Sequence, residues 1–127
     1  MQSVVEFDQQ GMAELLAAMD SDALDALTFG VIGFDLDNHV RRYNAYESRA
    51  AGLGSERVLD QDLFMVVAPC LNNFLVAQRF LDAREAGVAL DDTINYVLTL
   101  RMRPTKVRLR LLAAAGADLA YVLVQRL

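Results

Sequence analysis

The chain has 127 residues, a length at which one domain can bury an apolar core without help from a metal ion or a disulfide. Hydrophobic residues make up 54% of the sequence and charged residues 23%, a composition that excludes a disordered chain. Lys and Arg number 12 against 17 Asp and Glu, and the net charge of −5 argues against nucleic acid or an anionic membrane as a partner.

The single cysteine and single histidine cannot form an internal disulfide or a structural zinc site. Residues 1–10 lack a basic stretch followed by an apolar run, and no segment reaches the roughly 18 consecutive apolar residues of a membrane span. We therefore expect a cytoplasmic protein that does not enter the membrane.

Two short amphipathic helices are predicted between Met12 and Ala26, where apolar residues recur at helical spacing and Asp20-Ser21-Asp22 interrupts them. Extended runs at 29–34 and 39–43 then flank a cluster of turn-forming residues. These two runs predict a β-hairpin.

Three helices are predicted in the middle of the chain. One runs from Asn44 to Gly52, and a second begins at Ser55. A longer one fits 74–86, with Asn72 or Asn73 as its cap and Gly87 as its stop. Its buried face is expected to hold Phe74, Ala77, Phe80 and Leu81.

Three strands are predicted at the end of the chain, at 93–103, 105–111 and 119–124. The first two alternate apolar and polar residues, so each has one buried face. The basic residues between the apolar ones are expected to form a solvated outer face: Arg101, Arg103, Lys106, Arg108 and Arg110. The order of elements predicts an α+β domain with one antiparallel sheet of about five strands, flanked by short helices.

Cys70 is the first candidate for chemistry, because it follows Pro69 and precedes the predicted start of the helix at Phe74. The partial positive charge of a helix N-terminus favours a thiolate and makes the sulfur a better nucleophile toward an activated acyl group. A lone cysteine is, however, commonly a small buried hydrophobe, and this alternative stays open.

Tyr43 and Glu47 form a second candidate pair, since Tyr43 ends a strand and Glu47 lies four residues later on the next helix. Both side chains could face one pocket. The alternatives are structural: Glu47 three residues after Asn44 fits a capping box, and Tyr43 fits an ordinary aromatic at a strand end.

Four stretches, in this order, resemble the photoactive yellow protein family. They are Phe29-Gly30-Val31-Ile32, Tyr43-Asn44-Ala45 with Glu47, Val67-Ala68-Pro69-Cys70, and Met102 with Pro104-Thr105-Lys106-Val107. The resemblance runs from about Phe7 to Arg126 and implies a PAS fold. It also implies one domain over 1–127, with an N-terminal helical cap at 1–27 and a PAS core at 28–127.

By this resemblance Cys70 carries a 4-hydroxycinnamoyl (p-coumaric acid) chromophore as a thioester, and Tyr43 and Glu47 hydrogen-bond its phenolic oxygen. Because an ordinary phenol has a pKa of about 10, a buried phenolate needs such donors, and apolar surroundings would keep Glu47 protonated. The resemblance places around the chromophore Ala51, Leu53, Phe64, Ala68, Pro69, Leu98 and Met102.

Several residues depart from the family pattern. Ala51 stands where a threonine hydroxyl usually supports the tyrosine, and Leu53 stands where a pocket-capping arginine is expected. Leu100, Ser48 and Gln125 replace an aromatic residue, a glycine and a lysine. We therefore expect a thinner hydrogen-bond network around the phenolic oxygen.

The function implied is that of a blue-light photoreceptor, not an enzyme, that signals by photoisomerisation, proton transfer from Glu47 and loosening of the N-terminal cap. A downstream protein partner is expected, and the chain itself is expected to be a monomer or a weak homodimer. The alternative is a PAS module that has lost the chromophore and binds a small ligand or a protein. A cysteine-based acyl-transfer enzyme is disfavoured, because no histidine base accompanies Cys70 in the sequence.

Overall fold

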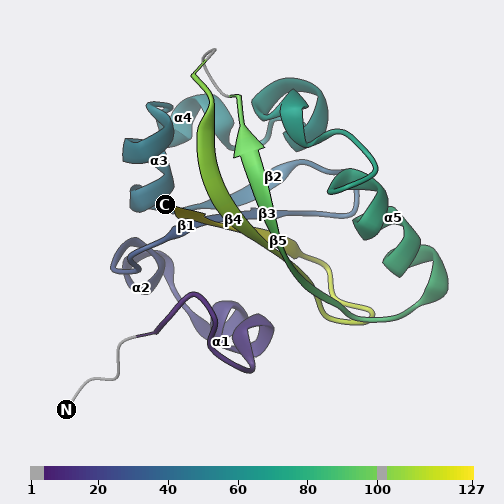
Figure 1. Cartoon of the computed structure of the whole chain (residues 1–127). Helices are drawn as coiled ribbons and strands as arrows, with labels where there is room; N and C mark the ends of the chain where they lie inside the picture. Colours follow the sequence, from purple (N-terminus) through teal and green to yellow (C-terminus); the bar gives the residue numbers. More distant parts are fainter. Residues whose placement is uncertain (1–4, 100–102) are drawn as a thin grey trace.

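The fold is built on one antiparallel sheet, seen in a computed structural model that describes residues 5–99 and 103–127. The strand order is β2-β1-β5-β4-β3, so the last strand of the chain lies at the centre. The strands are β1 (Gly30–Phe34), β2 (Val40–Tyr43), β3 (Leu90–Leu98), β4 (Thr105–Ala113) and β5 (Ala120–Arg126). This arrangement confirms the predicted α+β class and its antiparallel sheet (Figure 1).

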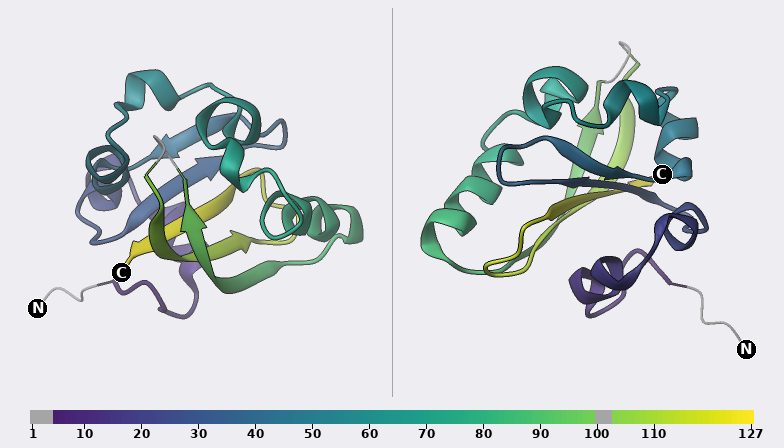
Figure 2. Two further views of the ribbon diagram at one scale, coloured as in Figure 1. Left: turned by 45° about the horizontal axis from the view of Figure 1, so that its top comes forward. Right: turned by 180° about the vertical axis from the view of Figure 1, so that it is seen from behind.

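Helices cover both faces of the sheet and create two separate apolar cores. Figure 2 shows α1 (Met12–Ala18) and α2 (Ser21–Asp25) on one face. The opposite face carries α3 (Ala45–Ala51), α4 (Ser55–Val58), a π-helical turn (Leu63–Val67), a 3₁₀ turn (Pro69–Leu71) and α5 (Ala77–Ala86). Within the described residues no helix is long and apolar enough to span a membrane.

The two N-terminal helices form as predicted and pack on the sheet. Asp20 caps α2 by accepting a hydrogen bond from the backbone N–H of Ala23. Their apolar side chains join residues of β1, β4 and β5 in one core that includes Phe7, Met12, Leu16, Leu24, Phe29, Leu112 and Tyr121. The division into a cap at 1–27 and a core at 28–127 stays a prediction.

The predicted hairpin and connecting helices are confirmed. In the hairpin turn the Asp35 carboxylate accepts hydrogen bonds from the backbone N–H groups of Asp37 and His39. α3 begins after Asn44 and ends at Gly52, whose φ of 69° is the left-handed conformation that glycine adopts without strain.

The predicted helix at 74–86 forms over ten residues, as α5 (Ala77–Ala86), and its start lies later than predicted. α5 begins at Ala77, because the Asn73 side chain accepts from the backbone N–H groups of Leu75 and Val76 and caps an irregular turn before the helix. Phe74 is 83% exposed and Leu81 44%, so the expected buried face is wrong at both residues. Phe80 is buried and Ala77 packs against the main core, as predicted, and Val76 and Ala83 are buried as well.

The last three strands form, with shifted ends. β3 begins at Leu90 rather than Thr93 and ends at Leu98, while Val107, Leu109 and Leu111 are buried as predicted. Residues Leu100, Arg101 and Met102 lie outside the described residues. The closing hairpin of β4 and β5 is confirmed by the register from Val107 opposite Arg126 to Ala113 opposite Ala120.

The solvated basic face predicted for β4 is wrong at Arg110, which is only 5% exposed. Its guanidinium binds both carboxylate oxygens of Asp91 and donates to the backbone carbonyls of Phe7 and Gln9 at 2.9 and 2.8 Å. The N-terminal segment around Phe7 and Gln9 therefore crosses this face of the sheet and covers Arg110. Hydrogen bonding to Arg110 lowers the pKa of Asp91.

Replacing Arg110 should detach the N-terminal segment. Arg110→Met keeps the aliphatic length but removes charged donors from two carbonyls, so we expect a loss of about 2 to 4 kcal/mol in the free energy of unfolding. Urea denaturation measures this loss, and limited proteolysis should cut first before residue 12. The control is Arg41→Met, which removes exposed pairs with Asp35 and Asp60 and should cost less than about 1 kcal/mol. Equal losses in the two variants would contradict this assignment.

Candidate functional site

Asn44 fixes the helix that carries the candidate residues. It is 1% exposed, and its side-chain oxygen accepts from the backbone N–H groups of Val31 and Glu47. Its side-chain nitrogen donates to the carbonyls of Leu24 and Phe29. One amide thus ties α2, β1 and α3 together, with all its hydrogen-bonding capacity used. Sequence reasoning identified the cap at Asn44 but not these links to α2 and β1.

Glu47 is buried against the sheet rather than in a capping box. Its side chain is 1% exposed, and its carboxylate accepts two hydrogen bonds from the Arg126 guanidinium, at 2.8 and 3.0 Å. A Cβ at Gly30 would collide with Oε1 of Glu47, so the glycine leaves the space that the carboxylate occupies. The expectation of apolar surroundings missed Arg126, because the pair joins residues 79 positions apart.

Tyr43 packs against the main apolar core, and its hydroxyl is more weakly acidic than that of an ordinary tyrosine. Its O–H donates to the carbonyl oxygen of Leu53 at 3.2 Å, and it lies 3.5 Å from the carbonyl oxygen of Glu47. Burial, and then the negative charge of Glu47, raise the pKa of Tyr43 well above its usual range. The hydroxyl is therefore a permanent hydrogen-bond donor at neutral pH.

Cys70 lies in the 3₁₀ turn Pro69–Leu71, seven residues before α5, so it is not next to the N-terminus of a long helix as predicted. The thiol is free and partly exposed, and it packs against the main core. Its backbone carbonyl oxygen accepts one hydrogen bond from the Tyr96 hydroxyl and another from the Asn73 side-chain amide, the latter at 3.2 Å. These two side chains fix the backbone that carries the sulfur.

Most of the other predicted site residues gather around the same core. Phe64, Ala68 and Leu98 belong to it, and Leu53 packs against it together with Tyr43 and Cys70. Ala51 is buried and, with Leu98 and Arg126, borders a hollow of about 440 Å³ beside α3. Pro69 is exposed, and Met102 lies outside the described residues.

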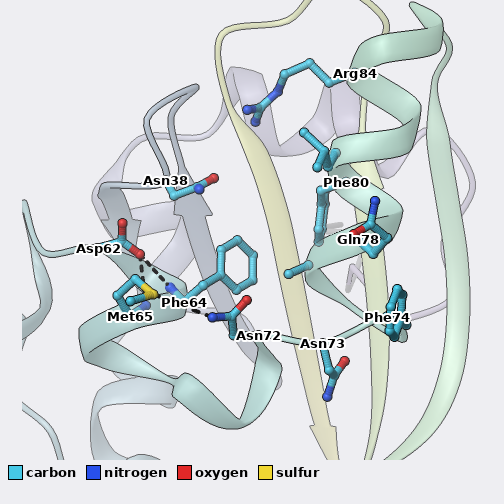
Figure 3. A pocket seen from close by; sticks show the side chains of 12 residues that line it. Asn38, Asp62, Phe64, Met65, Asn72, Asn73, Phe74, Gln78, Phe80 and Arg84 are labelled. Atoms are coloured by element: carbon cyan, nitrogen blue, oxygen red, sulfur yellow. Dashed lines mark hydrogen bonds between the residues drawn. The ribbon is translucent and has the colours of Figure 1, made fainter.

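A second hollow, of about 430 Å³, lies between α5 and the π-helical turn (Figure 3). Phe64 and Phe80 form its apolar wall, and the exposed Phe74 lies at its edge. Asparagine side chains from two segments also line it: Asn38, and the adjacent Asn72 and Asn73. Among the described residues, no cluster of three His, Cys, Asp or Glu side chains could hold a metal ion.

The fold and the buried site define a PAS domain, and comparison with known proteins supports this class. The chain is similar to a PAS domain of an HTR-like protein from Haloarcula marismortui, at 12% identity and a TM-score of 0.61 over 91% of this chain and 97% of that chain. At that identity the likeness shows the fold alone. No protein-family model matches the chain.

The family is shown by nearer relatives. Photoactive yellow protein of Halochromatium salexigens is 32% identical over 98% of this chain and 99% of the relative, and that of Rhodothalassium salexigens is 28% identical over 97% and 98%. The photoactive yellow protein domain of the sensor histidine kinase Ppr from Rhodospirillum centenum matches with a TM-score of 0.81 and 33% identity, over 89% of this chain and 98% of that chain. The chain belongs to the photoactive yellow protein family.

Alkaline pH should test the environment of Tyr43. In the unfolded chain a tyrosine loses its proton near pH 10, whereas folded Tyr43 keeps its proton to a higher pH. The unfolded state then binds fewer protons, so the stability present below about pH 10 falls as the pH rises further. Urea midpoints of wild type and Tyr43→Phe measured from about pH 9 to 11 should diverge, with the wild type losing stability faster. Parallel curves would place Tyr43 in an aqueous environment.

Proposed function

We propose that the chain is a blue-light photoreceptor that carries 4-hydroxycinnamic acid as a thioester on Cys70, and that it is not an enzyme. Membership of the photoactive yellow protein family supports a PAS photoreceptor. The observation that carries the finer proposal is the packing of Tyr43, Leu53 and Cys70, from separate segments, against one apolar core that contains Phe64 and Leu98. We further propose a cytoplasmic location and a downstream protein partner.

The residues at this core fit the proposed group. The Cys70 sulfur is in no disulfide and is partly exposed, as attachment requires. The Tyr96 and Asn73 hydrogen bonds to the Cys70 carbonyl hold the backbone beside it. The aromatic and aliphatic walls suit a flat ring, and Tyr43 supplies a hydroxyl that stays protonated.

When bound, the group would supply light absorption and a phenolic oxygen that can be charged. Tyr43 would donate a hydrogen bond to that oxygen, in place of its present bond to the Leu53 carbonyl. Glu47, whose two carboxylate oxygens accept from Arg126 in the chromophore-free chain, would take up a proton when the group binds and hold it toward the phenolic oxygen. The apolar walls would exclude water and so strengthen both hydrogen bonds.

The route from this site to the N-terminal cap would run along the central strands. Next to Arg126 on β5, Gln125 accepts a hydrogen bond from Arg108 at 3.1 Å. The Arg108 guanidinium lies 5.4 Å from the centre of the Phe7 ring and binds Asp8 at 3.1 Å. A shift of β5 near Glu47 would therefore disturb contacts that hold the cap, which supports cap loosening as the signal.

Labelling tests the proposed attachment. Purified chain mixed with an activated 4-hydroxycinnamate should gain the mass of one acyl group and a visible absorption band, while Cys70→Ser should gain neither, since its hydroxyl does not ionise at neutral pH. Mass spectrometry after proteolysis should find the added mass on Cys70. A folded wild type that stays unlabelled would contradict the photoreceptor.

That negative result would favour the alternative function, a PAS module that binds a small ligand or a protein partner. Two observations would then gain weight: Ala51 and Leu53 in place of the threonine and arginine expected from the resemblance, and the hollow beside α5 lined by aromatic and amide side chains. Figure 3 shows that this hollow has both an apolar wall and polar groups.

Position 51 should tune the acidity of the bound phenol. At present Tyr43 and Ser48 both donate to the Leu53 carbonyl, at 3.2 and 2.8 Å. A hydroxyl introduced by Ala51→Thr would give Tyr43 a polar neighbour and strengthen its donation to a phenolate, so the labelled variant should lose its visible band at a lower pH than the labelled wild type. Absorbance titrations at equal salt measure both midpoints. Coincident midpoints, or an upward shift, would show that residue 51 has no such role.

A further inference from the structure

A buried ion pair links α3 to the last strand of the sheet. Arg126 Nη1 lies 2.8 Å from Glu47 Oε1, and Nη2 lies 3.0 Å from Oε2. Two parallel hydrogen bonds of this kind are the geometry that an arginine forms with an ionised carboxylate. The Glu47 side chain is 1% exposed and that of Arg126 17%, so water screens the pair little.

Among the described residues, Arg126 is the one charged side chain that pairs with the Glu47 carboxylate. Within 5–99 and 103–127 the Glu47 carboxylate forms hydrogen bonds only with Arg126, and its Oε1 lies against Gly30 of β1. On the other side, hydrogen bonding to Glu47 raises the pKa of Arg126, while burial opposes this effect. Figure 1 shows the C-terminal end of the chain beside α3, which brings the two residues together.

We propose that Arg126 is the counter-ion and positioning residue that holds the ionised form of Glu47 inside the fold. A buried carboxylate without a partner is costly, and this cost would open the structure around it. With Arg126 in place, loss of the Glu47 proton leaves a charge that already has a partner. Ionisation of Glu47 alone then does not loosen the N-terminal cap.

The bearing of this ion pair on light signalling rests on the proposed function, whereas the pair itself can be tested in the chain without any chromophore. A double-mutant cycle isolates the interaction between Glu47 and Arg126. Glu47→Gln keeps the shape of the side chain, and Arg126→Met keeps the aliphatic length. Each single variant leaves one buried charge without its opposite charge, whereas the double variant leaves no unpaired charge.

We expect each single variant to unfold at lower urea concentration than the wild type, and the double variant to recover part of the loss. The coupling between the two sites should change the unfolding equilibrium constant by at least about tenfold, or about 1.4 kcal/mol. The matched control is the exposed pair Arg41 and Asp35, changed to Met and Asn, where coupling should stay below about fivefold. Additive losses at Glu47 and Arg126 would overturn the proposal.

Infrared spectroscopy detects whether Glu47 is protonated. This signal would not change if Arg126 only stabilised the fold. In the chromophore-free wild type, Glu47 should contribute no carboxylic-acid C=O band, so the wild type and Glu47→Gln should look alike in that region. In Arg126→Met, the stranded carboxyl should take up a proton and show the band, and Arg126→Lys should suppress it again. The double variant must lack it.

A carboxylic-acid band from Glu47 in the chromophore-free wild type, or no new band in folded Arg126→Met, would also overturn the proposal. These outcomes are independent of whether Cys70 accepts a chromophore. A chain that fails to label but shows the coupling and the infrared change would lose the proposed photoreceptor function and keep the ion pair.

Discussion

Burial of the Glu47 carboxylate is the constraint on which the arrangement of this site depends. The charge can be buried only because β1 has a glycine beneath it and because Arg126 faces it from β5. Asn44 adds the third requirement, since its amide holds α3 against β1. Loss of Arg126 or of Asn44 would leave a buried polar group without its partner, which costs more than the contact itself contributes. A side chain at position 30 would instead collide with the carboxylate.

The same sheet that supports the site also holds the N-terminal cap, on its other face. β4 and β5 contribute Val107, Leu109 and Val122 to the core beneath the site and Leu112, Tyr121 and Leu123 to the core beneath the cap. Because successive side chains of each strand point into opposite cores, a movement of β5 changes the packing on both faces of the sheet. Arg110 and Arg108 add polar links between β4 and the cap, through the Phe7 carbonyl and the Asp8 carboxylate.

The fold was largely predictable because its signals are local. Alternation predicted the strands, and side-chain caps and glycines predicted the helices, as at Asp20 and Gly52. The π-helical turn at 63–67 was not predictable, because Leu-Phe-Met-Val-Val is apolar throughout and has no helical period. The start of α5 was misplaced, since the Asn73 cap serves an irregular turn instead.

The candidate site was predictable only in part, because some of its contacts join residues far apart in the sequence. The positions of Cys70, Tyr43 and Glu47 in the chain made them candidates, and the resemblance gave each a role. The structure packs Tyr43 and Cys70 against one core and Glu47 against Gly30 and Arg126. Arg126 gave only a weak signal, a lone cation after the apolar run 119–124, because its pairing depends on the register of β5 beside β1. Burial of Arg110 likewise depends on the path of residues 5–10 across the sheet.

The most direct test of the account is the nitrogen-15 NMR spectrum of the Arg126 guanidinium in the chromophore-free chain. A guanidinium that donates two hydrogen bonds to one buried carboxylate rotates slowly about its Cζ–Nε bond. The account predicts two separate Nη signals for Arg126 that merge in Glu47→Gln. A single averaged Nη signal in the wild type would contradict it, because the guanidinium would then rotate freely and could not hold Glu47.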